Sequence, residues 1–350
     1  MCYAIETINL TRIFFTRIYP SISLFKSDAP YAFFYNLFHK IYKKSVKKVI
    51  AVNHINLKIR EKEIVGLIGP NGSGKTTLLR ILSCLIKPTE GTAKIYSFDI
   101  LKNKKRVLEI ISFIPGILTG GIWCNPGLSA RRNLIEMAKF FNFPKERVDE
   151  ALALAGLEDF ADIRVGNFSS GMLAKLSIAF SLLKNSKVYL LDEPMAGVSP
   201  EKVSYIHNYI KNHLNKKLGA TILYATHRIY DMEKLCDKIA IMNNGSIVAF
   251  GTTKELIKSI KKQKVIQINI RDFQNNIVNK VQKIYDVYRV NLIEYNLAYG
   301  IGIIRVYVSD ISASLPSIVK SIIDNGGKIQ YLKIFEPSLY DAFIYYTSKW

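Results

Sequence analysis

The sequence predicts an α/β fold built on a mostly parallel sheet, and three observations lead to this prediction. Short apolar runs such as residues 187–192 alternate with helix-like stretches such as residues 202–214. This alternation is typical of parallel strands whose connecting helices cover both faces of a sheet. The apolar run at residues 64–68 leads directly into a glycine-rich loop and then into a helix-like segment. Beyond about residue 255 the pattern changes, which predicts a second, smaller domain.

The N-terminal elements are expected in the order strand, insertion, strand. Residues 4–15 alternate well enough for a strand. Residues 16–48 are rich in aromatic, lysine and turn residues and predict an insertion, because strand-like sequence resumes at residues 49–60 and leads into the loop. Within the insertion, residues 31–42 fit an amphipathic helix with a basic edge, suited to a membrane surface or a partner groove. Packing of that helix on its own domain is an equally good interpretation.

Helices are expected through the middle of the chain. Residues 129–161 carry a stripe of Leu, Ile, Met and Phe, and residues 173–183 also read as a helix. Together they predict a helical subdomain over about residues 115–183. A further strand is expected at residues 220–225, and the first domain as a whole is expected to span residues 1–255.

The predicted second domain, residues 256–350, shows the order β-α-β-β-α-β. That order suggests a ferredoxin-like α+β sandwich. The strands are expected at residues 265–270, 292–299, 301–308 and 328–335, and the helices at residues 276–288 and 312–325.

Composition narrows the class of protein. A chain of 350 residues with 49% hydrophobic residues can form one large domain and a smaller one. Its net charge of +21 predicts an anionic partner or surrounding, namely nucleic acid, an acidic membrane surface or nucleotide, although lysines spread over solvated faces explain it equally well. Without an apolar run of 18–20 residues or a secretory signal, we expect a cytosolic chain that does not span a membrane. The cysteines (Cys2, Cys84, Cys124 and Cys236) lack disulfide or metal spacing, which suits a reducing compartment.

The glycine-rich segment at residues 69–77 is the most specific motif in the chain. It fits the pattern G-x-x-x-x-G-K-[ST] between a strand and a helix, where backbone N–H groups bind phosphates. The residues predicted to bind nucleotide here are Gly69, Pro70, Asn71, Gly72, Ser73, Gly74, Lys75, Thr76 and Thr77. Lys75 would direct its charge toward the β- and γ-phosphates, and the Thr76 hydroxyl would bind Mg²⁺. The motif predicts that the protein binds a nucleoside triphosphate.

Two acidic residues and one histidine follow later strands. Asp192 and Glu193 end the apolar run at residues 188–191. We predict that Asp192 holds Mg²⁺ and that Glu193 polarises the attacking water as a general base. His227 follows the strand-like residues 221–225, at the strand end where ligands bind in open parallel sheets, and would contact the γ-phosphate.

A Ser–Gly loop at Ser169, Ser170 and Gly171 precedes the helix-like residues 173–183. Such a loop caps a helix and can also bind phosphate. The first loop already serves one nucleotide, so this second loop is expected to serve a nucleotide held by another subunit. Taken alone, an ordinary helix cap is the simpler interpretation.

With these motifs in this order, the chain resembles the ATP-binding subunits of ABC transporters over roughly residues 4–258. The resemblance implies a P-loop NTPase fold with an antiparallel β subdomain and a helical subdomain, ATP and Mg²⁺ as ligands, and ATP hydrolysis. It implies a head-to-tail dimer, with a second copy or a paralogous subunit, in which each ATP lies between Lys75 of one subunit and Ser169 and Gly171 of the other. It also implies a multi-spanning permease partner, peripheral membrane contact and a place on the cytoplasmic face of the cell membrane. The tail at residues 336–343 and the form of the Ser–Gly loop resemble the multidrug and polysaccharide exporter branches.

The chain departs from the family pattern at several positions. The family's glutamine is missing from residues 116–127, and Ser199 stands where the family has aspartate. Ser170 and Met172 replace the usual glycine and glutamine. The resemblance also implies an aromatic that stacks on adenine, best assigned to Phe14, with Phe38 and Tyr42 as rivals because of the insertion.

Two other functions remain as alternatives. A soluble ABC-type ATPase that acts on nucleic acid or ribosomes fits the positive charge, although such proteins usually carry paired ATPase domains or a long coiled coil. A regulatory subunit that binds ATP without hydrolysing it fits the missing glutamine and Ser199. The intact Glu193 and His227 favour hydrolysis.

Overall fold

The protein is described from a computed structural model that covers residues 3–17, 46–114, 124–140, 143–195, 200–260 and 264–347. The chain forms two compact units. The first contains Met1–Arg228 and Leu235–Val248, and the second contains Ile229–Lys234 and Ala249–Trp350. The division therefore falls seven residues before the boundary expected at residue 255, and a short segment after His227 belongs to the second unit.

The first unit is built on a six-stranded sheet. Its order is β11 (Ser246–Gly251), β10 (Lys238–Asn243), β4 (Ile64–Ile68), β9 (Thr221–Thr226), β8 (Val188–Asp192) and β7 (Ile111–Ile114). The five strands from β10 to β7 run parallel. Every residue of β4, β8 and β9 is buried, as expected for parallel strands covered on both faces.

An antiparallel sheet lies beside the central one. It contains β1 (Tyr3–Arg17), β2 (Val46–Ile55), β3 (Lys58–Arg60), β5 (Glu90–Ile95) and β6 (Phe98–Asp99). This is the antiparallel β subdomain that the resemblance implies.

The β1–β2 ladder changes the expected bounds of the insertion. Thr16 pairs with Lys47 and Arg17 with Val46, so these residues extend the hairpin instead of belonging to the insertion. Residues at both ends of the predicted insertion thus continue the pairing of β1 with β2. The predicted amphipathic helix at residues 31–42 lies outside the described residues.

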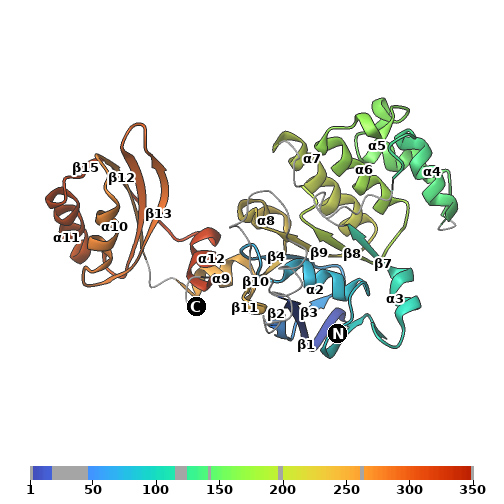
Figure 1. Ribbon diagram of the computed structural model, residues 1–350, viewed down its shortest axis with the longest axis horizontal. Coiled ribbons are helices and arrows are strands. Elements are labelled where there is room, and N and C mark those ends of the chain that lie inside the picture. The colour runs from blue at the N-terminus through green and yellow to red at the C-terminus, as the bar shows by residue number, and fades with distance from the viewer. Residues whose placement is uncertain are drawn as a thin grey trace, which may run out of the picture. The chain divides into compact units, whose positions relative to one another are not determined.

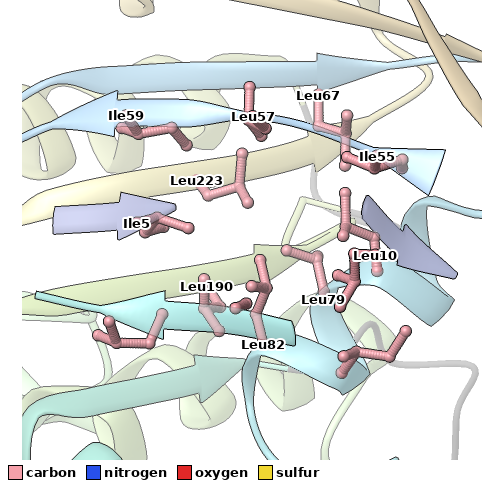
Figure 2. Close-up of a cluster of buried hydrophobic side chains, with 14 of the residues drawn as sticks. Ile5, Leu10, Ile55, Leu57, Ile59, Leu67, Leu79, Leu82, Leu190 and Leu223 are labelled. Carbon is pink, nitrogen blue, oxygen red and sulfur yellow. The ribbon is translucent and has the colours of Figure 1, made fainter. Parts of the chain in front are cut away.

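The core of the first unit is formed between these two sheets and the helix after the glycine-rich loop (Figure 2). Leu10 of β1 lies beside Leu79 of helix α2 (Lys75–Leu82), Ile5 comes from the same strand β1, and Leu190 and Leu223 come from the central strands. All five side chains are fully buried. Each such burial contributes about 1.5–3 kcal/mol, which fixes the loop between β4 and α2 in place.

Helices gather on the other side of the central strands (Figure 1). They are α4 (Ala130–Phe140), α5 (Arg147–Leu154), α6 (Ser170–Leu182) and α7 (Pro200–Tyr209), whereas α3 (Lys104–Ile110) precedes β7. The helical stretch expected at residues 129–161 is in fact two helices and a 3₁₀ turn (Glu158–Phe160), with Pro144 in the connection. The helix expected at residues 202–214 continues from α7 as a π-helix, Ile210–Lys217.

The second unit has the βαββαβ order. It consists of β12 (Lys264–Arg271), α10 (Asn275–Gln282), β13 (Val287–Asn296), β14 (Ile301–Val308), α11 (Ile311–Asp324) and β15 (Lys328–Phe335). The sheet order is β13-β14-β12-β15 and all three pairings are antiparallel. A separate core of Ile and Val side chains fills the space between this sheet and its helices.

Two boundaries in this unit differ from the expectation. Helix α10 ends at Gln282 instead of residue 288, and β13 begins at Val287 instead of residue 292. Asp286 has a φ of 70°, which a helix cannot accommodate. The side-chain oxygen Oε1 of Gln282 accepts a hydrogen bond from the Val290 N–H at 2.7 Å, and this bond closes the turn.

Three short helices complete the second unit: α8 (Ile229–Leu235, whose last residue belongs to the first unit), α9 (Thr253–Lys258) and α12 (Leu339–Thr347). Helix α9 begins with a reciprocal cap between Thr252 and Glu255. Asp341 of α12 is buried and accepts hydrogen bonds from Tyr307 and Arg305 of β14. The chain tail is thereby held on the sheet.

Candidate active site

The glycine-rich loop lies between β4 and α2 and packs tightly on neighbouring backbone. Gly74 has a φ of 104°, and a Cβ added there would lie 2.0 Å from the Ala51 carbonyl oxygen. A Cβ on Gly69 would lie 2.3 Å from the Met242 carbonyl oxygen. Both positions therefore require glycine, because any side chain would displace the loop.

Backbone hydrogen bonds hold one side of the loop, and its other side is exposed to solvent. The Gly245 N–H donates to the Ser73 carbonyl oxygen at 3.0 Å, and the Ser73 N–H donates to the Pro70 carbonyl oxygen at 3.2 Å. Pro70, Asn71 and Gly72 are exposed. The Ser73 hydroxyl oxygen is buried and has no hydrogen-bond partner among the described residues. An unpaired buried hydroxyl in such a loop is suited to a ligand oxygen.

Lys75 starts helix α2 with its ammonium group folded back on the loop. Its Nζ donates to the carbonyl oxygens of Gly69 at 2.7 Å and Pro70 at 3.2 Å. Burial lowers the pKa of Lys75, and the nearby carboxylates of Glu193 and Asp192 act in the opposite direction. The cation is thus positioned among the loop atoms that would surround a phosphate.

Thr76 and Asp192 form the next contact. The Thr76 hydroxyl donates to Asp192 Oδ1 at 3.1 Å. Asp192 is only 2% exposed, and this burial raises the pKa of its carboxyl; the hydrogen bond from Thr76 partly offsets the effect, and the Glu193 charge adds to it. A hydroxyl and a carboxylate side by side are the oxygen ligands that a hard divalent cation prefers.

Glu193 follows β8 with its backbone in the left-handed region, at a φ of 46°. Its N–H donates to the Ala225 carbonyl oxygen at 2.9 Å. The Thr226 hydroxyl donates to Glu193 Oε2 at 3.0 Å, and His227 Nδ1 lies 2.9 Å from Glu193 Oε1. Each carboxylate oxygen of Glu193 therefore has one hydrogen-bonding partner in this arrangement.

The topology explains why these groups meet. Strand β9 lies between β4 and β8, and all three strands run parallel. The glycine-rich loop follows the carboxyl end of β4, Asp192 and Glu193 lie at that of β8, and His227 follows that of β9. Ligands bind at this edge of the sheet in such folds. Sequence-predicted site residues from three separate segments thus gather at one edge.

The Ser–Gly loop forms the N-terminal cap of helix α6 in this chain. Ser169 caps α6 by accepting the Met172 N–H at 3.3 Å, Ser170 begins the helix, and Gly171 lies in its first turn. Among the described residues, Ser169 accepts hydrogen bonds from the N–H groups of Met172 and Leu173, both in α6.

Phe14 lies in β1 opposite Val49 of β2 and is partly exposed. The Arg12 guanidinium lies 4.6 Å from the centre of its ring. One ring face is therefore engaged by a cation. Phe38, Tyr42, Ser199 and residues 116–123 all lie outside the described residues.

Sequence reasoning missed two contributors to this site. Thr226 was not singled out, although a hydroxyl residue at a strand end beside a histidine was a readable signal. The support of the loop by Ala51, Met242 and Gly245 had no such signal, because these residues are distant in sequence from the loop.

The described groups fit a triphosphate with a divalent cation. The Lys75 ammonium group and the unpaired buried hydroxyl of Ser73 belong to the loop where phosphate oxygens would bind, and Thr76 with Asp192 would supply oxygen ligands for a cation. In the described part of the chain there is no cluster of three His, Cys, Asp or Glu side chains that could hold a metal ion. Mg²⁺ does not need one, since it keeps several waters and binds substrate phosphates. Within the same described ranges, no helix has the length and apolar content needed to cross a bilayer.

Comparison with known proteins places these features in a family context. A family profile described as "ABC transporter" matches residues 52–196. Bacitracin transport ATP-binding protein BcrA of Bacillus licheniformis is 32% identical over 295 residues, which cover 84% of this chain and 91% of that protein. Linearmycin resistance ATP-binding protein LnrL of Bacillus subtilis (strain 168) is 27% identical over 264 residues, covering 74% and 83% respectively. A solved dimeric structure of a bacterial ABC transporter cassette matches with a TM-score of 0.55 at 25% identity and covers 71% of this chain and 98% of that one.

Proposed function

The chain belongs to the ABC transporter family as one of its ATP-binding, ATP-hydrolysing subunits, and from this premise we propose that it is the motor subunit of a membrane exporter. The observation that carries the proposal is the meeting of the glycine-rich loop, the Thr76–Asp192 pair and the Glu193–His227 pair at the carboxyl ends of three adjacent parallel strands. A binding module alone would need only the first of these groups.

The proposed roles follow from the contacts. Residues 69–77 bind the phosphates of ATP, and Lys75 exchanges its loop carbonyls for β- and γ-phosphate oxygens. Thr76 and Asp192 would hold Mg²⁺, which would supply positive charge to offset the phosphate charge. Burial raises the pKa of Asp192, so a cation bound beside it would favour its ionised form.

Glu193 is the proposed general base. Its Oε1 accepts a proton from the water that attacks the γ-phosphate, and the rest of the carboxylate stays fixed on β9. His227, whose side chain is 63% exposed, is free to turn from Glu193 toward the γ-phosphate when ATP is present. The active site would thereby distinguish ATP from ADP.

We propose that the working form is a head-to-tail dimer, with a second copy or a paralogous subunit. The confinement of Ser169 to its own helix supports this, since the loop of Ser169, Ser170 and Gly171 then remains available for the nucleotide of the partner. The dimeric state of the matched cassette is further support. Phe14, with Arg12 over one ring face, is proposed to stack on adenine with the other face.

The proposed membrane partner is a multi-spanning permease, which would hold this chain peripherally at the cytoplasmic face of the cell membrane. Asn125, Leu128, Met137 and Phe140 line an open depression of about 590 Å³ on the helical subdomain, where a permease segment can dock. Phe140 is 77% exposed there. The names of the relatives, bacitracin transport and linearmycin resistance, support export as the direction.

The test is purification of Glu193→Gln from detergent-solubilised membranes of the native cell with ATP present. We expect loss of about 10²- to 10⁴-fold in ATP turnover, as for removal of a general base, and recovery of a multi-spanning subunit. Glu61→Gln, an exposed carboxylate remote from the site, is the matched control and should keep full turnover.

Two results would contradict the proposal. Near-normal turnover in Glu193→Gln would remove Glu193 as the base. Recovery only in the soluble fraction with ribosomes or nucleic acid, with a steep salt dependence, would favour the alternative of a soluble ATPase acting on those partners.

A further inference from the structure

Thr226 occupies an unusual place between the strand β9 and the catalytic carboxylate. It is the last residue of β9 and is 2% exposed. Its hydroxyl lies 3.1 Å from the Arg228 backbone nitrogen and 3.0 Å from Glu193 Oε2. A buried hydroxyl with two such neighbours joins them in one chain of hydrogen bonds.

The direction of this chain of bonds is fixed by the donors. The Arg228 N–H can only donate, so the Thr226 oxygen accepts from it. The single proton of the Thr226 hydroxyl is then directed to Glu193 Oε2. Oε2 is thus an acceptor in this arrangement, and Oε1 is the oxygen left to take a proton.

The backbone of Glu193 adds a second connection to the same strand. Its N–H donates to the Ala225 carbonyl oxygen, one residue before Thr226. Its φ of 46° is a position that costs a non-glycine residue free energy and persists only when its surroundings hold it. Ala225 and Thr226 therefore hold Glu193 by its main chain and by its side chain.

The two side-chain partners of Glu193 differ in mobility. Thr226 is buried within a strand that is buried along its whole length, whereas the His227 side chain is 63% exposed. A buried β-branched side chain has few accessible χ1 rotamers, whereas an exposed imidazole has space to change rotamer. Of the two contacts, the one to Thr226 is fixed and the one to His227 can change.

We propose that Thr226 is a positioning residue for the general base, and that it keeps Glu193 aimed at the attacking water while His227 changes partner. This inference rests on the proposed function. In the hydrolysis step the water proton moves to Glu193 Oε1, and Oε2 retains the hydrogen bond from Thr226. In this role Thr226 acts on the reaction only through Glu193.

Thr226→Val tests the proposal, because valine matches threonine in shape and lacks the hydroxyl. We expect kcat for ATP hydrolysis to fall about ten- to a hundred-fold, as for a misplaced catalytic group, with KM and the Kd for ATP within twofold of the unaltered protein. Thr226→Ser retains the hydroxyl and should restore most of kcat.

Thr221→Val is the matched control. Thr221 is also buried in β9, and its hydroxyl likewise accepts a backbone N–H, from Lys62 at 2.9 Å. It has no contact with Glu193, so it should lose a similar amount of thermal stability while kcat stays unchanged.

The outcomes separate this inference from the function on which it rests. If the unaltered protein hydrolyses ATP and Glu193→Gln does not, yet Thr226→Val retains full kcat, the positioning role is wrong and the proposed function stands. Equal losses of kcat in Thr226→Val and Thr221→Val would reduce Thr226 to a structural residue. A failure of the unaltered protein to hydrolyse ATP would overturn the proposed function itself.

Discussion

At the scale of single residues, the site contains groups that lower the stability of the folded chain. Asp192 is buried at the end of β8 and accepts a hydrogen bond from the Thr76 hydroxyl. Burial holds the pKa of this carboxyl above its ordinary value, so the ionised form is disfavoured in the folded chain. Such a group is retained for a ligand, not for stability.

Asp192→Asn should therefore make the nucleotide-free protein more stable at neutral pH. The folded pKa of Asp192 lies above the unfolded one, so the folded state binds more protons between the two values and stability falls as pH rises through that window. Asparagine keeps an acceptor for Thr76 and carries no charge. Each kcal/mol relieved corresponds to roughly 2–4 °C in Tm for a domain of this size.

Thermal unfolding at several pH values checks this expectation. The gain in Tm from Asp192→Asn should be largest at neutral pH, shrink as the pH falls below the folded pKa, and vanish below the unfolded pKa, where Asp192 is protonated in both states. ATP with Mg²⁺ should stabilise this variant less than the unaltered protein. A gain that is the same at every pH would show that charge burial is not its cause.

At the scale of elements, helix α12 depends on one buried carboxylate. Asp341 accepts from the Ser338 N–H at 2.8 Å, the Ser338 hydroxyl at 2.6 Å, the Tyr307 hydroxyl at 2.8 Å and Arg305 Nη1 at 3.2 Å. The Tyr340 ring beside it stacks on Tyr230 at 6.0 Å between centroids. These contacts join α12 to the sheet and to α8 within the second unit.

Asp341→Ala should destabilise the second unit by about 3–5 kcal/mol, because it leaves a largely buried Arg305 without its counter-ion. Hydrogen exchange along residues 339–347 and denaturant unfolding measure the effect. Glu336→Ala is the control: its side chain is 83% exposed and its pair with Lys264 lies at the surface, so the change should stay within about 0.5 kcal/mol. Comparable losses in both variants would argue against a special role of Asp341.

The elements also show what could be predicted from the sequence. Strands β4, β8 and β9 were predictable because they are buried on both faces and read as unbroken apolar runs. Strands β14 and β15 match the expected bounds because turns at Gly300 and Gly326 mark their starts.

Other features depend on contacts that a local pattern does not carry. The predicted end of α10 was wrong because Val287 continues an apolar spacing that suits a helix as well as a strand. Helix α12 was not predicted, since its buried Asp341 finds its partners 34 and 36 residues away in β14. The closeness of Ala51 and Met242 to the loop is equally non-local. Sequence reasoning therefore found the chemistry of the site and missed its supports.

At the scale of the whole molecule, the proposed head-to-tail dimer would complete the site. One chain supplies the phosphate loop, Asp192, Glu193 and His227, but the contacts of its Ser169 remain within α6. In the proposed dimer, the net charge of +21 on each chain would oppose pairing, and bound ATP would lower that repulsion by adding negative charge where the subunits meet.

We expect Glu193→Gln to elute as a dimer in size-exclusion chromatography with ATP and as a monomer with ADP. Added salt should weaken the dependence on nucleotide charge by screening the repulsion between chains. The double variant Glu193→Gln with Lys75→Ala, which lacks the phosphate cation, should stay monomeric with either nucleotide. A monomer at saturating ATP would contradict the head-to-tail dimer.

The left-handed backbone of Glu193 has a consequence for the history of this chain. A non-glycine residue at a φ of 46° costs of order 1–3 kcal/mol, and glycine or asparagine would occupy the same position with less strain. Random substitution therefore drives this position away from glutamate, since the simplest replacements make the fold more stable. A chain that no longer hydrolysed ATP would therefore gain stability by replacing Glu193 with glycine.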